Sequence, residues 1–162
     1  MKTLLLFIGL LPLSLNAQIT NLETFLRLEN MMINDAVTNL VNIGWEFGGQ
    51  ETTRKKDDNG NVVETITYVS VKYPKHAQEL IFITSVDWVK SKVLYSGLEL
   101  KGNNKEDFFI SDVEEDLVRL GFKKKNKDYE RYVDENGINF KLIATHKENS
   151  KSKSLKLIRK KI

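Results

Sequence analysis

The chain has 162 residues, with 25 lysines and arginines against 22 acidic residues, a net charge of +3 and no cysteine. This near balance of charge argues against nucleic acid or another polyanion as the main partner. The absence of cysteine excludes disulfides, thiolate metal sites and thiol nucleophiles. The length fits one domain with a core of its own.

Residues 1–17 have the layout of a secretory signal peptide. Lys2 is followed by the apolar run Leu4–Leu13 and by a small residue, Ala17, at the expected cleavage site. The apolar run is too short to span a bilayer. This segment resembles the signal peptides of exported proteins of Bacteroidota. We therefore expect an exported protein, periplasmic or secreted, with a single domain at residues 18–162 and no transmembrane segment after cleavage.

The rest of the chain contains an internal repeat with an offset of 77 residues. The segment Glu29–Trp45 aligns with Glu106–Phe122, and the same register continues through a shared Asp-x-Asn-Gly motif. We interpret residues 18–103 and 104–162 as two units of one pseudo-symmetric domain, because two copies are too few for a stacked solenoid. Identical positions, numbered in the first copy, include Glu29, Asp35, Leu40, Val41, Gly44, Arg54, Asp57, Asn59, Gly60 and Ile66.

Each unit is predicted to begin with an amphipathic helix. In the first unit Thr20 and Glu23 fit a capping box, and Gly44 fits the left-handed residue that ends a helix. In the second unit the helix ends at Gly121, and its start is open between Asn104 and Ser111; the alignment favours the earlier one. The apolar stripes, at three- and four-residue spacing, comprise Leu22, Phe25, Leu26, Ile33, Ala36, Val37 and Leu40, then Phe109, Val113, Leu117 and Leu120.

Seven β-favouring segments follow the two helices. Short turns join neighbouring segments, which permits antiparallel pairing. We expect an α+β fold in which two tandem α-β-β-β(-β) units form one antiparallel sheet, with two helices packed on one face and the other face open. Gly48-Gly49 predicts a bulge or a bend in the first strand. The segments are residues 45–54, 61–73, 79–89 and 91–101 in the first unit, and 128–133, 138–146 and 154–162 in the second.

The two Asn-Gly motifs, Asn59-Gly60 and Asn136-Gly137, raise the question of calcium loops. A calcium-binding EF-hand loop needs an oxygen ligand at its first position and a glutamate at its last. In the first motif the first position is Lys55 and the last is Ile66. In the second motif these positions are Tyr132 and Ile143, so both loops lack the required ligands. Asn-Gly between β-favouring segments instead predicts type I′ hairpin turns.

No residue pattern indicates catalysis, a cofactor or a metal. His76 and His146 lack zinc-binding spacing, and we expect the first to be solvated and the second to pack on its strand. The acidic group from Asp112 to Asp116 falls on the polar side of a helix. Phosphate-binding and nucleophile-elbow motifs are absent from the sequence. We therefore predict no catalytic, cofactor-binding or metal-binding residue, and a protein that is not an enzyme.

Two features are candidates for binding. The C-terminal segment from Lys147 is rich in lysine, which fits either an edge strand protected against pairing or weak contact with an anionic surface. Among the aromatic residues, Trp45 is expected to anchor the core because Phe122 matches it in the repeat. The possible interface residues are Trp88, Tyr68, Tyr73 and Tyr95. Trp88, near a strand end, is the better interface candidate of the two tryptophans, although packing in the core is the favoured alternative for it.

In layout, two helix-then-antiparallel-sheet units forming one sheet resemble the β-lactamase-inhibitor-protein-like fold, although the cysteines of that inhibitor family are absent here. The resemblance implies an exported protein-binding module. Our leading hypothesis is a non-enzymatic module that binds another exported or cell-envelope protein through the open sheet face or the hairpin loops. The alternative is a small-molecule or lipid carrier with a pocket between helices and sheet.

Overall fold

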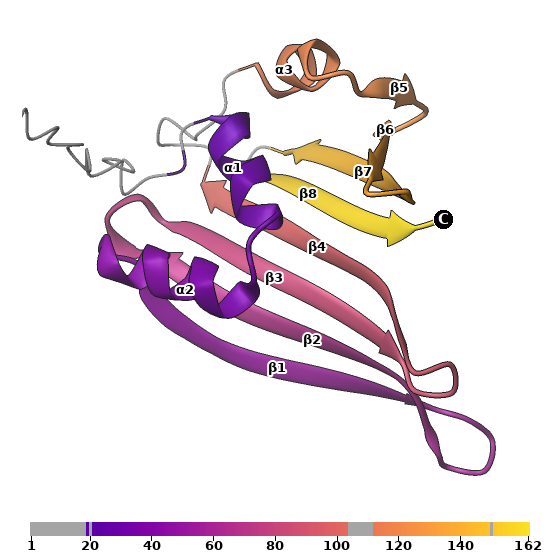
Figure 1. Cartoon of the computed structure of the whole chain (residues 1–162). Helices are drawn as coiled ribbons and strands as arrows, with labels where there is room; N and C mark the ends of the chain where they lie inside the picture. Colours follow the sequence, from indigo (N-terminus) through magenta and orange to yellow (C-terminus); the bar gives the residue numbers. More distant parts are fainter. Residues whose placement is uncertain (1–18, 20, 104–111, 150) are drawn as a thin grey trace, which may run out of the picture.

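The structure, a computed structural model, describes residues 19, 21–103, 112–149 and 151–162 (Figure 1). The predicted signal peptide lies outside these residues. The described part has an α+β fold, with three α-helices and one eight-stranded antiparallel sheet. The helices are α1 (Leu22–Glu29), α2 (Ile33–Asn42) and α3 (Val113–Arg119), and a short 3₁₀ helix, η1 (Pro74–His76), follows the second strand.

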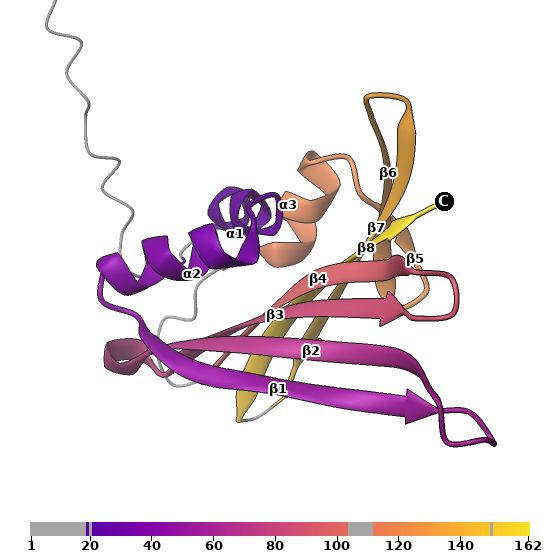
Figure 2. The same cartoon turned by 60° about the horizontal axis from the view of Figure 1, so that its bottom comes forward.

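The strand order in the sheet is β1-β2-β3-β4-β8-β7-β6-β5. Strands from each half of the chain are neighbours, and the pairing of β4 with β8 joins the two halves in the middle (Figures 1 and 2). The strands are β1 (Glu46–Lys56), β2 (Val62–Tyr73), β3 (Gln78–Asp87), β4 (Lys92–Asn103), β5 (Lys123–Lys125), β6 (Asp128–Glu135), β7 (Ile138–Glu148) and β8 (Ser152–Lys161).

Each of the seven predicted segments overlaps one of these strands. Of the bulge or bend predicted at Gly48-Gly49, the structure has the bulge, as a register shift between Phe47 and Gly49. The eighth strand, β5, was not predicted, because three consecutive lysines have no apolar alternation. A tight turn at Asn126, with φ of +58°, brings β5 back against β6. The strand therefore forms through its neighbour and not through its own propensity.

The first predicted helix is wrong in one respect: it is two helices, α1 and α2. Asn30 ends α1, and its side-chain amide donates to the carbonyl of Leu26 at 3.2 Å. Met32 then adopts an extended conformation before α2 begins. Leu28 and Ala36, on either side of the break, are both buried. The apolar stripe thus continues from α1 into α2. For this reason the periodicity of apolar residues does not reveal the break between the two helices.

The helix starts also differ from the predictions. Asn21 caps α1, because its side-chain oxygen accepts a hydrogen bond from the Thr24 N–H at 2.8 Å; the capping box proposed at Thr20 is therefore wrong, and Thr20 itself lies outside the described residues. Asp112 is the residue before α3. Both predicted starts of the second helix, Asn104 and Ser111, lie outside the described residues.

The core joins residues of the helices to one face of the sheet. Trp45 is 2% exposed, and its ring lies 5.5 Å from that of Tyr73 on β2. Val69 and Val71 are buried beside Tyr73, as the alternation of this segment predicted. In Figure 2 the helices lie on the same side of the sheet. The opposite face of the strands is left without a covering layer of described residues.

Several local features recur 77 residues apart. Gly44 and Gly121 both have positive φ, +101° and +85°, as expected for residues that end helices. After each glycine the next residue donates its backbone N–H back into the helix at 3.0 Å, from Trp45 to Leu40 and from Phe122 to Leu117. All four of these side chains are buried in the core.

The two Asn-Gly turns differ. Asn136 and Gly137 both have positive φ and join β6 to β7 directly, which is the predicted type I′ hairpin. Only Gly60 has positive φ in the first motif, where a five-residue loop joins β1 to β2. A type I′ turn is therefore wrong there. The Asp57 carboxylate accepts the N–H groups of Asn59 and Asn61 and stabilises the longer loop.

The lysine-rich strand β8 lies in the middle of the sheet, between β4 and β7. The interpretation as a protected edge strand is therefore wrong. Leu155 and Leu157 of β8 are buried, whereas Lys156 and Lys160 alternate with them on the opposite face. These lysines are outward-facing residues of a central strand, and the apolar residues that alternate with them lie in the core.

Candidate functional site

One row of residues crosses all eight strands on the face of the sheet opposite the core. The neighbouring row, one residue along each strand, contains buried core residues such as Phe82 and Leu98. Because successive side chains of a strand point to opposite faces, the first row lies on the other face, which we call the open face. From β1 to β5 the row is Glu51, Tyr68, Ile83, Gly97, Ile158, Ile143, Glu130 and Lys123.

The centre of this row is apolar and tightly packed. Ile83 is only 2% exposed although it lies on the open face, so its neighbours on that face cover it. Gly97 permits the close packing of β4 on β8. A Cβ atom there would lie 2.5 Å from the Leu157 carbonyl oxygen and 2.6 Å from the Ile158 Cδ1 atom. The Ile158 side chain therefore occupies the space above Gly97.

Two tyrosines border this apolar centre. Tyr68 pairs with Ile83 across β2 and β3, and Tyr95 pairs with Ser85 across β3 and β4. Ser85 is fully buried, and its hydroxyl donates to the Glu64 carboxylate at 2.6 Å. Burial raises the pKa of Tyr95, with smaller contributions from Tyr68 and Glu64. Both rings are partly exposed, and they offer apolar faces with polar tips.

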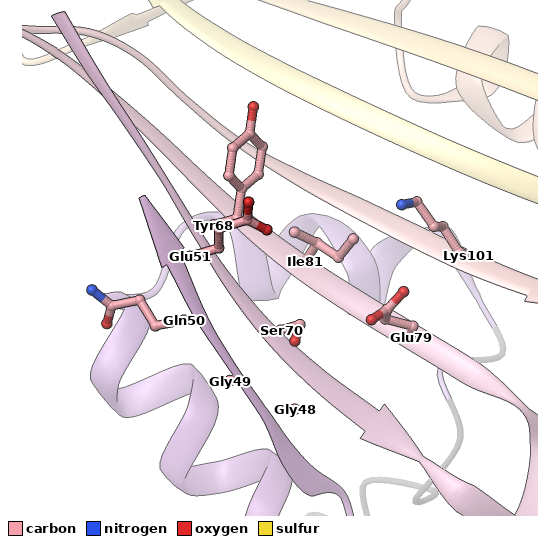
Figure 3. A pocket seen from close by; sticks show the side chains of 9 residues that line it. All are labelled: Gly48, Gly49, Gln50, Glu51, Tyr68, Ser70, Glu79, Ile81 and Lys101. Carbon is pink, nitrogen blue, oxygen red and sulfur yellow. The ribbon is translucent and has the colours of Figure 1, made fainter. Parts of the chain in front are cut away.

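A hollow of about 450 Å³ lies on the open face next to Tyr68 (Figure 3). Gly48 and Gly49 form its end on β1. A Cβ atom on Gly48 would lie 2.5 Å from the Ser70 hydroxyl, and Gly49 has φ of +124°, so larger residues fit poorly at both positions. The two glycines therefore leave this end of the hollow without side chains. Its other lining residues are Gln50, Glu51, Ser70, Glu79, Ile81 and Lys101.

Charged residues surround the apolar centre. At one end of the row Glu130 forms ion pairs with Lys141 at 2.8 Å and with Lys125 at 3.5 Å. The hydrogen bond from Lys141 lowers the pKa of Glu130. Lys160 lies over the Tyr95 ring, 5.8 Å from its centroid. The open face thus has an apolar centre with charged residues around it.

The structure separates the four predicted interface residues. Tyr68 and Tyr95 lie together on the open face, and Tyr68 lines the hollow. Tyr73 is buried in the core. Trp88 is 55% exposed and lies over the other face of the sheet, where its indole N–H donates to the Thr65 hydroxyl at 3.1 Å. It lines a separate shallow hollow with Thr52, Arg54, Val62 and Thr67.

Sequence reasoning missed the isoleucines of the open face. The signal was present in β3, where Leu80-Ile81-Phe82-Ile83 is apolar at every position. An antiparallel strand with one solvated face should alternate, so a continuous apolar run indicates that both faces contact something. The same argument applies less strongly to Ile143, which lies between the core residues Leu142 and Ala144, and to Ile158, which follows the core residue Leu157.

The groups with shifted pKa values among the described residues take part in structural contacts. Glu114 accepts hydrogen bonds from the Tyr129 hydroxyl at 2.5 Å and from Lys124 at 3.2 Å, and these lower its pKa. His146 is half-buried opposite Leu155 on β8, and the side chain of His76 lies outside the description. In the part of the chain that the structure describes, no cluster of three or more His, Cys, Asp or Glu side chains is arranged to hold a metal ion.

None of the helices at the described positions has the length and apolarity needed to cross a bilayer. Comparison with models of known families, with curated proteins and with solved structures finds no match to this chain. The resemblance in layout to the β-lactamase-inhibitor-protein-like fold therefore stays a prediction.

Proposed function

We propose that this protein is an exported, non-enzymatic module that binds another exported or cell-envelope protein through the open face. The observation that carries the proposal is the apolar row across β2, β3, β4, β8 and β7, bordered by Tyr68 and Tyr95. Tyrosines beside an apolar centre with a charged rim are typical of residues that dominate binding energy in protein interfaces. Periplasmic or secreted location belongs to the same proposal and rests on residues 1–17.

The packing between helices and sheet favours this function over a carrier. A carrier would need room for a ligand between the two layers. The side chains that face each other there, among them Ala36, Leu40, Leu98 and Leu117, are at most 3% exposed and belong to one cluster. The hollow beside Tyr68 instead opens on the outer face of the sheet (Figure 3), where it can receive a side chain of a protein partner.

We also infer that the chain consists of two tandem units whose helices pack on one face of a shared sheet. The recurring helix ends at Gly44 and Gly121, and the matching hydrogen bonds of Trp45 and Phe122, support this inference. Such an arrangement uses every helix to cover the core side. It leaves the full width of the other face for a partner.

Site-specific photo-crosslinking in the producing cell tests the proposal. A benzophenone amino acid is placed at Ile81, in the hollow, and in a second variant at Thr38, on an exposed position of α2. We expect one discrete crosslinked protein from Ile81 that Thr38 does not give. Equal crosslinking from both positions, or none from Ile81, would contradict the use of the open face.

A further inference from the structure

The strand β1 forms one edge of the sheet and is exposed along nearly its whole length. Within the described part of the chain it pairs with β2 alone, and ten of its eleven residues are exposed. Between the register shifts at Phe47–Gly49 and Lys55–Lys56, the segment Gly49–Lys55 is regular. An edge of this kind presents backbone N–H and C=O groups to any strand that approaches.

The two edges of the sheet differ in how they are protected. The opposite edge, β5, has only three residues, all lysines, which discourage pairing. The regular part of β1 has no proline, and its charges are of both signs. Glu51 precedes Thr53 by two residues, and Lys55 follows it by two. The β1 edge is therefore open to a strand whose charges are complementary to its own.

We propose that β1 pairs antiparallel with β1 of a second copy of this chain, about a two-fold axis at Thr53. In that register Glu51 of each copy lies directly opposite Lys55 of the other, and both residues lie on the open face. Opposite charges at directly facing positions stabilise an antiparallel pair, and like charges destabilise it. Parallel pairing in register would instead set Glu51 against Glu51 and Lys55 against Lys55. The sheets of the two copies become continuous. This inference does not rest on the proposed function.

A single cysteine tests the register, because the natural chain has none. Facing Cα atoms of an antiparallel pair are about 4.5–5.5 Å apart, within the range that a disulfide spans. We expect Thr53→Cys to give a disulfide-linked dimer on mild oxidation, and light scattering to give twice the monomer mass for the unmodified protein. Gln50→Cys is the matched control and should not crosslink, since the two copies of that position lie far apart. A monomeric mass at about 0.1 mM, or crosslinking at Gln50 instead of Thr53, would overturn the proposal.

Charge exchange tests the pairing without a covalent bond. We expect Glu51→Lys and Lys55→Glu, each alone, to weaken dimerisation at least tenfold, because each sets like charges opposite each other. The double variant E51K/K55E restores opposite charges and should recover the dimer. Circular dichroism confirms that each variant is folded. Dimerisation unchanged in both single variants, or lost in the folded double variant, would contradict the register. The readout is mass, so it is independent of partner binding through the open face.

Discussion

A buried ion pair connects α1 to the centre of the sheet. The side chain of Glu29 is 3% exposed and that of Arg159, on β8, is 13% exposed; the guanidinium Nη1 lies 3.2 Å from the Glu29 carboxylate. Arg159 also donates to the Asn30 side chain at 2.9 Å, pairs with Glu135 and lies over the Phe140 ring. The second carboxylate oxygen of Glu29 has no hydrogen-bond partner among the described residues. Glu29 therefore depends on Arg159 for compensation of its charge.

We predict that Arg159→Met lowers the free energy of unfolding by about 3–5 kcal/mol near neutral pH. Removing one partner of a buried pair leaves an uncompensated buried charge, and losses of this size follow. Glu135 is 46% exposed, so its pair with Arg159 adds at most about 1 kcal/mol. The double variant E29Q/R159M should recover most of the loss, because no buried charge is left.

The loss should depend on pH in a defined direction. Burial is the main cause that raises the pKa of Glu29, and Arg159 partly opposes it. A carboxyl with a raised folded-state pKa contributes stability at low pH and loses it as pH rises through that pKa. Without Arg159 the pKa rises further, so the cost of R159M is largest near neutral pH and shrinks toward the ordinary carboxyl value of 4.5.

The free energy of unfolding is measured by urea denaturation, with tryptophan fluorescence as the signal, at pH values of about 7.5 and about 5. The wild type, R159M, E29Q and the double variant form a complete cycle. A loss below about 1 kcal/mol at the higher pH, or an equal loss at both, would refute the assignment of Glu29 as a buried charge held by Arg159.

Five further substitutions, which probe three features of the structure, have defined outcomes. Gly97→Ala should cost about 3 kcal/mol in unfolding free energy, because the added Cβ meets a backbone carbonyl of β8; a normal denaturation midpoint would contradict this. Asn136→Ala should cost about 1–2 kcal/mol, since its φ is +56°, whereas Asn59→Ala, which lacks positive φ, should cost less; equal costs by urea denaturation would be inconsistent with the different turns. Trp45→Ala and Phe122→Ala should each cost about 3–5 kcal/mol; a small loss at either, measured by thermal unfolding, would show that it is not part of the core.

Local patterns predicted most of the elements but not their neighbours in space. The alternation of Val69, Val71 and Tyr73 located both β2 and its buried side, and Gly44 and Gly121 located the helix ends. These features depend on short-range sterics and periodicity, which a sequence records directly. Fold class and strand positions followed from them.

Features set by tertiary contacts were not predictable in the same way. The place of β8 in the middle of the sheet depends on its pairing with β4, and its lysines, taken alone, suggested an edge. The break at Asn30 leaves the apolar stripe intact. The open face combines residues from strands far apart in sequence, such as Ile83 and Ile158, on either side of Gly97. Strand register brings these side chains together. The apolar run of β3 indicates that both of its faces are in contact, but it does not record which residues of the other strands lie opposite.

If a protein partner binds the open face, substitutions on that face must weaken its binding. The most direct test isolates the crosslinked partner and measures its dissociation constant for variants of the open face. Tyr68→Ala and Ile158→Lys should each weaken binding at least tenfold, because they remove an aromatic contact and place a charge in the apolar row. Thr38→Lys, on an exposed position of α2, is the control and should change the dissociation constant by less than about twofold. Binding unaffected by both open-face changes in folded protein would contradict the account.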